Sequence, residues 1–235
     1  MDKSKLETKL YEIAESWGAD LFGIADLNEA RQPLEEVFHR SFDYPRAICV
    51  GKFFPEEVVS GLFFPGGEAA YKHYYHVLNR RLDDVALDIY SYLNGLGYNS
   101  LPVPASQRIP GTLRSAFSHR AAASLAGIGW IGRHCSIVTP QRGPRVRLTT
   151  ILTSAELNPG SPLKASCGEC YVCVEVCPVK ALKKVPFKPE DPLEDRFDAK
   201  ACEKFTASQE TRVGFDVCGL CIASCPVGRP GGKAK

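Results

Sequence analysis

The sequence predicts a mixed α/β (α+β) domain followed by a small cysteine-rich domain. The first 155 or so residues alternate helix-like and strand-like apolar segments, whereas eight of the ten cysteines follow residue 166. A chain of 235 residues, of which 44% are apolar, is long enough to bury a core. From "LNPGSPLKAS" onward proline, glycine and cysteine interrupt the pattern. We therefore place the domain boundary near residue 160, with domains at 1–160 and 161–235.

The N-terminal elements follow from the period of the apolar residues. A first amphipathic helix is predicted because one face carries Leu6, Leu10, Ile13 and Trp17. The segments "DLFGIA" and "RAICVGKFF" have the composition of short buried strands. A long helix is then predicted up to Gly95 and Gly97, because apolar side chains recur at helical spacing at Tyr71, Tyr75, Leu78, Leu82, Val85, Ile89 and Leu93.

Three further elements complete the first domain. The segment "SHRAAASLAG" predicts a short alanine-rich helix that Gly127 ends. The segments "HCSIVT" and "VRLTTILT" predict strands, and the second is rich in β-branched residues.

The N-terminus and the length of the apolar runs predict a cytoplasmic protein. The segment "MDKSKLETKLYEIAESW" is charged and is not a signal peptide, and there is no twin-arginine leader. No apolar run approaches the ~20 residues of a membrane span, so no membrane association is expected. In a reducing compartment structural disulfides are disfavoured, and the cysteines need another explanation.

The cysteine spacing is typical of a bacterial ferredoxin. The first group is Cys167-x2-Cys170-x2-Cys173-x3-Cys177-Pro178. The second group, Cys218-x2-Cys221-x3-Cys225-Pro226, repeats the end of the first, and Cys202 stands upstream as the missing ligand. Eight ligands predict a ferredoxin-like domain with two [4Fe–4S] clusters that passes single electrons.

In such ferredoxins the fourth cysteine of each run binds the other cluster. That rule predicts one quartet of Cys167, Cys170, Cys173 and Cys225, and a second of Cys177, Cys202, Cys218 and Cys221. The alternative is two structural zinc sites, which the third closely spaced thiolate and the two Cys-Pro endings disfavour. Cys49 and Cys135 lie in apolar strand-like surroundings and are expected to be inert core thiols.

The middle of the chain has an unusual charge pattern. Residues 89–155 contain no aspartate, glutamate or lysine, but seven arginines: Arg108, Arg114, Arg120, Arg133, Arg142, Arg145 and Arg147. Such asymmetry favours an anion nearby over scattered surface arginines. Loaded clusters are anionic, so this stretch is expected to contact the cluster domain.

Glycines in "AGIGWIGRHCSIV" have the spacing of a dinucleotide-binding loop. That fingerprint requires a strand before the glycines, a helix after them and an acid about 20 residues later. Here a helix precedes and a strand follows, and no acid occurs near residue 150. A nicotinamide cofactor is therefore disfavoured. The glycines instead indicate that the backbone comes close to a large flat group, with the Trp130 indole as one wall of its site. The alternative is that Trp130 only packs inside the protein.

The segments "AGIGWIGRHCSIVTP…VRLTTILT" and "CGECYVCVEVCP", with the second cysteine group, resemble the epoxyqueuosine reductases and the related catalytic core of reductive dehalogenases. This resemblance implies a nitroreductase-like corrinoid-binding domain, capped by a ferredoxin-like domain whose two clusters feed electrons to cobalt. It also implies that the glycine–tryptophan loop lines a corrinoid (cobalamin) at Gly127, Gly129, Trp130, Ile131 and Gly132.

Two departures from that family concern the reaction. The catalytic aspartate of epoxyqueuosine reductases would fall on Leu113 by ungapped counting, and no acid occurs nearby. No Asp-x-His-x-x-Gly motif surrounds any histidine, which fits a base-off corrinoid without a protein ligand. A proton donor is still needed, and His119, Arg114 and Arg120 are candidates beside the loop. A second group consists of Tyr71, His73, Tyr74 and Tyr75.

The sequence thus favours a cobalamin-dependent iron–sulfur reductase acting on a small or nucleoside-like substrate. Its expected electron donor is a low-potential ferredoxin or flavodoxin. One alternative is a non-catalytic electron-transfer protein that reduces a partner, such as a corrinoid protein. Another is a flavin variant whose arginines bind the phosphate of FMN. A tRNA partner is less favoured, because the arginines are not interleaved with aromatic residues.

Overall fold

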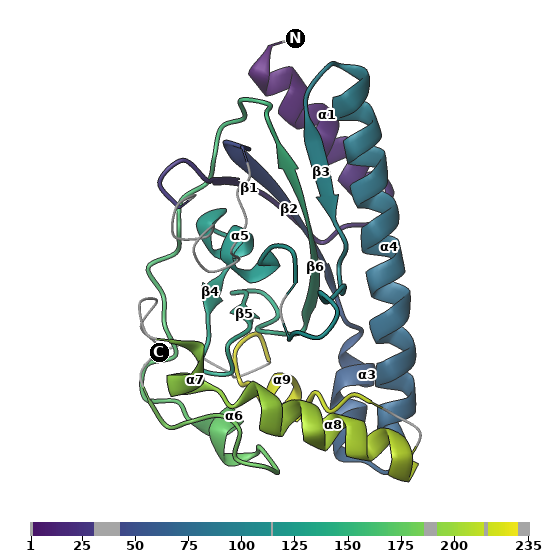
Figure 1. Cartoon of the computed structure of the whole chain (residues 1–235), viewed down its shortest axis with the longest axis vertical. Coiled ribbons are helices and arrows are strands. Elements are labelled where there is room, and N and C mark those ends of the chain that lie inside the picture. The colour runs from purple at the N-terminus through teal and green to yellow at the C-terminus, as the bar shows by residue number, and fades with distance from the viewer. Residues whose placement is uncertain (1, 31–42, 114, 186–191, 214–215, 230–235) are drawn as a thin grey trace. The chain divides into compact units, whose positions relative to one another are not determined.

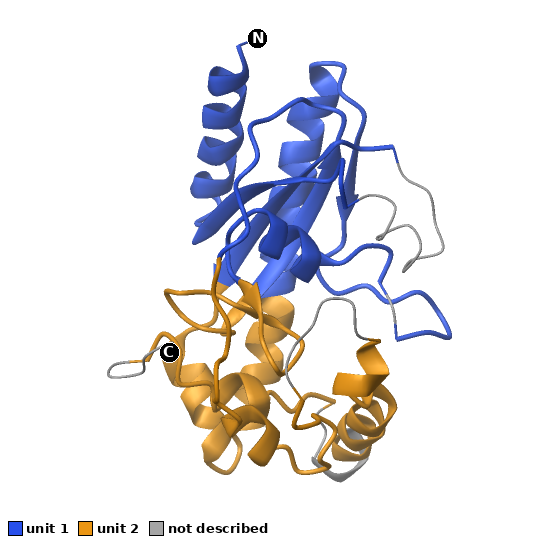
Figure 2. Ribbon diagram, turned by 90° about the vertical axis from the view of Figure 1, so that its left-hand side faces the viewer, with its two compact units in different colours: residues 1–52, 78–129, 147–163 blue, residues 53–77, 130–146, 164–235 orange. Residues whose placement is uncertain are grey.

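The computed structural model describes residues 2–30, 43–113, 115–185, 192–213 and 216–229. It has the predicted mixed α/β fold and divides into two compact units (Figure 2). Unit 1 comprises Met1–Lys52, Leu78–Gly129 and Arg147–Leu163, and unit 2 comprises Phe53–Val77, Trp130–Val146 and Lys164–Lys235. Unit 2 therefore contains the cysteine-rich part together with two segments that precede residue 160 in the sequence. The division into functional domains at residue 160 stays a prediction.

Unit 1 contains a four-stranded sheet in the order β1-β2-β6-β3 (Figure 1). Its strands are β1 (Leu21–Asp26), β2 (Arg46–Phe53), β6 (Val146–Thr153) and β3 (Ser100–Val103). The pairs β1/β2 and β3/β6 are antiparallel. The predicted strands therefore form three of the four, and β2 and β6, which are the most buried, are the central pair.

Helices cover both faces of this sheet. α1 (Lys3–Ser16) and α4 (Gly67–Gly95) pack apolar side chains, such as Leu10 and Ile89, against Ile24 of β1. Successive residues of a strand face opposite sides. The neighbouring Gly23 accordingly faces Ala126, at the end of α5 (His119–Leu125). The two helices predicted from apolar spacing and the short alanine-rich helix are confirmed.

Unit 2 is built from short elements. It contains α3 (Glu56–Ser60), η1 (Gly61–Phe63), the start of α4, and a hairpin of β4 (Trp130–Ile131) and β5 (Ile137–Val138). The cysteine-rich part adds α6 (Val172–Glu175), α7 (Leu193–Arg196), α8 (Ala199–Val213) and α9 (Leu220–Ala223). No helix among the described residues has the length and apolarity needed to cross a membrane.

The predicted strand "HCSIVT" is wrong at its beginning. Only Ile137 and Val138 are extended, and Thr139 forms an isolated bridge with Gly143. Cys135 lies in the preceding turn with a φ of 58°, a conformation that few non-glycine residues adopt. It is a buried thiol, as expected, but not a strand residue.

Candidate cluster-binding site

All eight cysteines of the two sequence groups lie in unit 2, and none forms a disulfide. Short helices carry three of them: Cys173 is in α6, Cys202 in α8 and Cys221 in α9. The other five are in the adjoining loops at Cys167, Cys170, Cys177, Cys218 and Cys225. Thiols held on several separate segments can surround a cluster from different sides.

Electrostatic effects among the thiols identify which ones are neighbours. Burial raises the pKa of Cys173 to about 12, and the next causes are the charges of Cys167, Cys225 and Cys170. Burial also raises the pKa of Cys225, and Cys167 and Cys170 act on it in the same direction. These four thiols are the ones that the ferredoxin rule assigns to the first quartet, and their grouping around one cluster stays a prediction.

The charges acting on Cys221 bear on the second predicted quartet. Burial raises the pKa of Cys221, followed by the charges of Cys218, Cys173, Cys202 and Cys177. Three of these belong to the predicted second quartet, and Cys173 is a neighbour because α6 contacts α9. Among the described residues, no three metal-binding side chains converge on a point suited to a single metal ion. In a four-iron cluster, by contrast, each thiolate binds its own iron.

Arg133 holds the loop that carries Cys167 and Cys170. Its Nε donates to the Cys170 carbonyl oxygen at 2.9 Å, and its two terminal nitrogens donate to the carbonyl oxygens of Gly168 at 2.5 Å and Val185 at 2.6 Å. Its guanidinium carbon lies 3.9 Å from the centre of the Tyr171 ring. The side chain is buried, so these contacts satisfy both the cation and three carbonyl groups.

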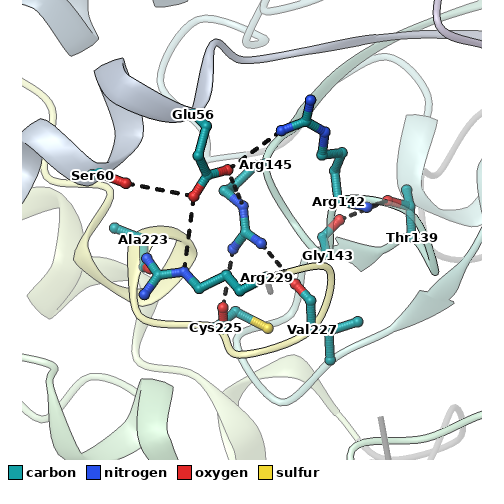
Figure 3. Close-up of polar contacts among 10 residues, drawn as sticks. All are labelled: Glu56, Ser60, Thr139, Arg142, Gly143, Arg145, Ala223, Cys225, Val227 and Arg229. Atoms are coloured by element: carbon teal, nitrogen blue, oxygen red, sulfur yellow. Dashed lines mark hydrogen bonds and ion pairs between the residues drawn. The ribbon is translucent and has the colours of Figure 1, made fainter. Parts of the chain in front are cut away.

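Arg145 holds the loop that carries Cys225 (Figure 3). Its terminal nitrogens donate to the carbonyl oxygens of Cys225 at 3.0 Å and Val227 at 2.8 Å, while Nε lies 3.1 Å from a carboxylate oxygen of Glu56. The Arg145 side chain is fully buried. Arg142 and Arg229 also face Glu56, at 3.7 and 4.0 Å. Two arginines of the acid-free stretch therefore contact the cysteine loops, as its charge pattern predicts.

Trp130 packs beside the same loop. Its indole is buried in a cluster with Val138, Cys225 and Val227. The indole Nε1 has no hydrogen-bond partner among the described residues. A buried donor without a partner is unfavourable, so this N–H is suited to an acceptor on a bound group.

Contacts within the chain explain two of the loop glycines. At Gly127, which has a φ of 75°, a Cβ atom would lie 2.4 Å from the backbone oxygen of Ser161. At Gly132 a Cβ atom would lie 2.7 Å from a methyl group of Val138. Glycine is therefore required at both positions by local packing. A corrinoid contact at Gly127, Gly129, Trp130, Ile131 or Gly132 stays a prediction.

Gly219 permits close packing beside Cys218. Its φ is 74°, and a Cβ atom there would lie 2.8 Å from both Leu62 and the Tyr71 ring. We expect Gly219→Ala to weaken iron binding by the second quartet and to destabilise the loaded protein by about 1–2 kcal/mol or more. Iron analysis and thermal unfolding check this, with Gly97→Ala as a control, because that glycine has a φ of 86° in open space. Equal losses in both variants would contradict a packing role for Gly219.

His119 begins α5 and uses both ring nitrogens. Nε2 donates to the Pro104 carbonyl oxygen at 3.0 Å, because a carbonyl only accepts, and Nδ1 therefore accepts from the Thr150 hydroxyl at 2.9 Å. Burial lowers its pKa to about 4. His119 is neutral near pH 7 and its hydrogen bonds favour a structural role; its part in catalysis stays a prediction.

This pKa predicts a pH dependence of stability. The unfolded chain binds a proton at His119 below about pH 6.5, whereas the folded chain binds it only near pH 4. Stability should therefore fall as pH drops from about 6.5 to about 4, by up to about 1.4 kcal/mol per pH unit. Urea unfolding of the wild type and His119→Asn across this range isolates the effect as a difference. Parallel pH curves for the two proteins would refute it.

The other candidate proton donors are distributed differently. Arg114 lies outside the described residues. Arg120 is exposed on α5, and Leu113, at the position counted for the family aspartate, is also exposed. In the second group, Tyr71 is buried and stacks on Phe54, whereas His73 and Tyr74 are exposed. A role for any of these side chains as the proton donor stays a prediction.

Cys49 matches the expectation of an inert thiol. It is fully buried in β2. Burial raises its pKa to about 12, so the reactive thiolate is not formed near neutral pH.

Comparison with known proteins confirms the suspected resemblance. No family model matches the chain. An epoxyqueuosine reductase of Bacillus anthracis is 43% identical over 65 residues, which are 28% of this chain and 17% of that protein. One of Lactococcus garvieae is 28% identical over 190 residues, covering 77% of this chain and 50% of that protein. The matches span 17% to 51% of the length of these curated relatives, all named epoxyqueuosine reductase.

Solved structures show the same fold. An epoxyqueuosine reductase covers 97% of this chain with a TM-score of 0.62 and 21% identity, and 66% of its own chain is matched. Another such enzyme was solved with an epoxyqueuosine-modified tRNA stem loop, with a TM-score of 0.63 and 21% identity; 97% of this chain and 66% of that one are covered. A reductive dehalogenase described with B12-dependent dehalogenation covers 94% of this chain and 31% of its own, with a TM-score of 0.71 and 19% identity.

Proposed function

We propose that this chain is an iron–sulfur reductase that uses two [4Fe–4S] clusters and a base-off corrinoid to reduce a small or nucleoside-like substrate. The observation that carries the proposal is that eight free thiols at ferredoxin spacing, all buried or half-buried, lie in one unit and influence one another electrostatically. The homology to proteins named epoxyqueuosine reductase supports the same chemistry.

The residues present fit the clusters. Soft thiolates are the usual ligands of iron–sulfur clusters, and all eight thiols are free of disulfides. Arg133 and Arg145 fix the loops of the first quartet through carbonyl contacts and supply positive charge beside it. When bound, the clusters supply single electrons, and a corrinoid would supply the low-potential cobalt centre that reacts with substrate.

The corrinoid is assigned to the glycine–tryptophan loop. Trp130 offers a buried indole N–H without a partner among the described residues, which fits an acceptor on a bound cofactor. The loop also runs directly into β4, beside Val138 and Cys225. The packing of Trp130 against Cys225 supports a corrinoid bound near the first cluster.

Substrate and partners follow by homology and chemistry. A two-electron reduction of a substrate requires electrons that the clusters pass one at a time. An external donor of low potential, such as a ferredoxin or flavodoxin, has to supply these electrons to the clusters. One relative binds a modified tRNA stem loop, which makes a nucleoside within tRNA a reasonable substrate class to test. Since neutral His119 does not readily donate a proton, we place the proton source on the substrate side or in water.

Anaerobic reconstitution tests the proposal. The full chain is loaded with iron and sulfide, then mixed with cobalamin or FMN and followed by absorption and EPR spectroscopy. We expect about eight irons per chain and the signal of base-off cob(II)alamin. Loading of fewer than about four irons would refute the cluster assignment. Selective binding of FMN would replace the corrinoid by a flavin.

A second candidate is a non-catalytic electron carrier for a partner protein. It is favoured by the absence of any acid between residues 89 and 155, where the related enzymes have a catalytic aspartate. In that case both clusters form, but neither cofactor binds. The reduced protein would then reduce a separate corrinoid protein.

A further inference from the structure

We propose that Arg145 raises the reduction potential of the cluster held by Cys167, Cys170, Cys173 and Cys225, and that Glu56 partly offsets this effect. The inference rests on the proposed function, because it concerns a cluster bound by this quartet. It adds a role for two residues outside the cysteine motifs.

The contact is direct. Two nitrogens of Arg145 donate to the carbonyl oxygens of Cys225 and Val227, at 3.0 and 2.8 Å (Figure 3). One carbonyl belongs to Cys225 itself, and the other to Val227, two residues later in the Cys225-Pro226-Val227 segment. The guanidinium therefore lies beside the backbone that presents this thiol to the cluster.

The charge is effective because it is buried. The Arg145 side chain is 0% exposed, so water does not screen it, whereas Arg142 is 46% exposed. Glu56 faces three cations: the buried Arg145 and the less buried Arg142 and Arg229. One carboxylate against three guanidinium groups leaves an excess of positive charge.

Reduction adds one negative charge to a cluster, so a fixed cation nearby stabilises the reduced form. Hydrogen bonding, net charge and solvent exposure are among the factors that set cluster potentials. The carbonyl oxygens that accept hydrogen bonds from Arg145 belong to Cys225 and Val227, in the loop of the first quartet. The shift should therefore affect one cluster more than the other.

The test is an EPR-monitored redox titration of the full, reconstituted chain. Arg145→Gln should lower the reduction potential of one cluster by about 59 mV. At a fixed solution potential, the ratio of reduced to oxidised cluster should then fall about tenfold. Arg145→Lys keeps the charge and should restore most of the shift. Glu56→Gln should move the same cluster in the opposite direction. Arg142→Gln, which alters an exposed member of the same network, is the matched control.

The outcomes separate this inference from the proposed function. If the wild type does not load two clusters, the proposed function fails. If both clusters load but Arg145→Gln shifts neither, or shifts both equally, the role of Arg145 is overturned. If Arg145→Gln does not fold, Glu56→Gln decides: an upward shift supports the inference, and an unchanged potential overturns it. A Cys202→Ser background, which removes the other cluster, identifies the one that moves.

Discussion

Replacing Cys177 and Cys221 together with alanine is expected to leave about four irons per chain, whereas replacing Cys177 and Cys225 together should leave almost none. In the proposed arrangement Cys177 and Cys221 both bind the second cluster, so that double variant should lose only one cluster. Cys225 is assigned to the first quartet with Cys167 and Cys173, whose charges act on it or are influenced by it, although it follows Cys221 in the sequence. Iron and sulfide analysis, together with EPR spin counting, measures the difference.

A matched pair of variants makes this test specific. Each protein has two cysteines removed, so a general loss of cysteine affects both equally. If the quartets followed the order of the chain instead, Cys177 would belong with Cys167, Cys170 and Cys173. The two double variants would then behave alike, and each would lose both clusters. That result would contradict the exchange of ligands between the two groups.

Replacing Arg133 with methionine should prevent stable loading of the first quartet. The change leaves the carbonyl oxygens of Gly168, Cys170 and Val185 without their donor. Gly168 and Cys170 are half-buried and Val185 is exposed, so water can replace part of the lost hydrogen bonding, and we expect a loss of about 1–3 kcal/mol in the loaded protein. Thermal unfolding and the rate of cluster loss to a chelator measure it.

Two controls accompany the Arg133 variant. Arg133→Lys keeps the charge but lacks the planar fork that reaches three carbonyl groups, so it should recover only part of the stability. Arg80→Gln removes an arginine that is exposed on α4 and should change stability by less than about 0.5 kcal/mol. Equal behaviour of Arg133→Met and Arg80→Gln would show that the carbonyl contacts are unimportant.

Elements with many apolar side chains could be predicted from the sequence. In the long helix, Leu78, Leu82, Val85, Ile89 and Leu93 are all buried, as their spacing indicates. β3 was not predicted because it has only four residues and contains Pro102, which removes a hydrogen-bond donor. It lies at the edge of the sheet, where proline is tolerated.

The candidate site was predictable only where its chemistry is local in sequence. The spacing within "CGECYVCVEVCP" indicates clusters without any structure. The partners of Arg145 could not be predicted, because Cys225 is 80 residues away and Glu56 lies far upstream in α3. Likewise, Gly127 and Gly132 have the spacing of a cofactor loop, but their contacts with Ser161 and Val138 depend on the folded chain.

The long sequence separation of the Arg145 contacts also constrains the order of events during synthesis. The carbonyl groups that Arg145 binds are made 80 and 82 residues after it. A nascent chain that ends before Cys225 therefore lacks both a thiol of the first quartet and the backbone that this arginine holds. In the proposed arrangement, insertion of a complete first cluster would have to wait until the ribosome has passed this segment, and the other seven thiols would have to stay unoxidised until then.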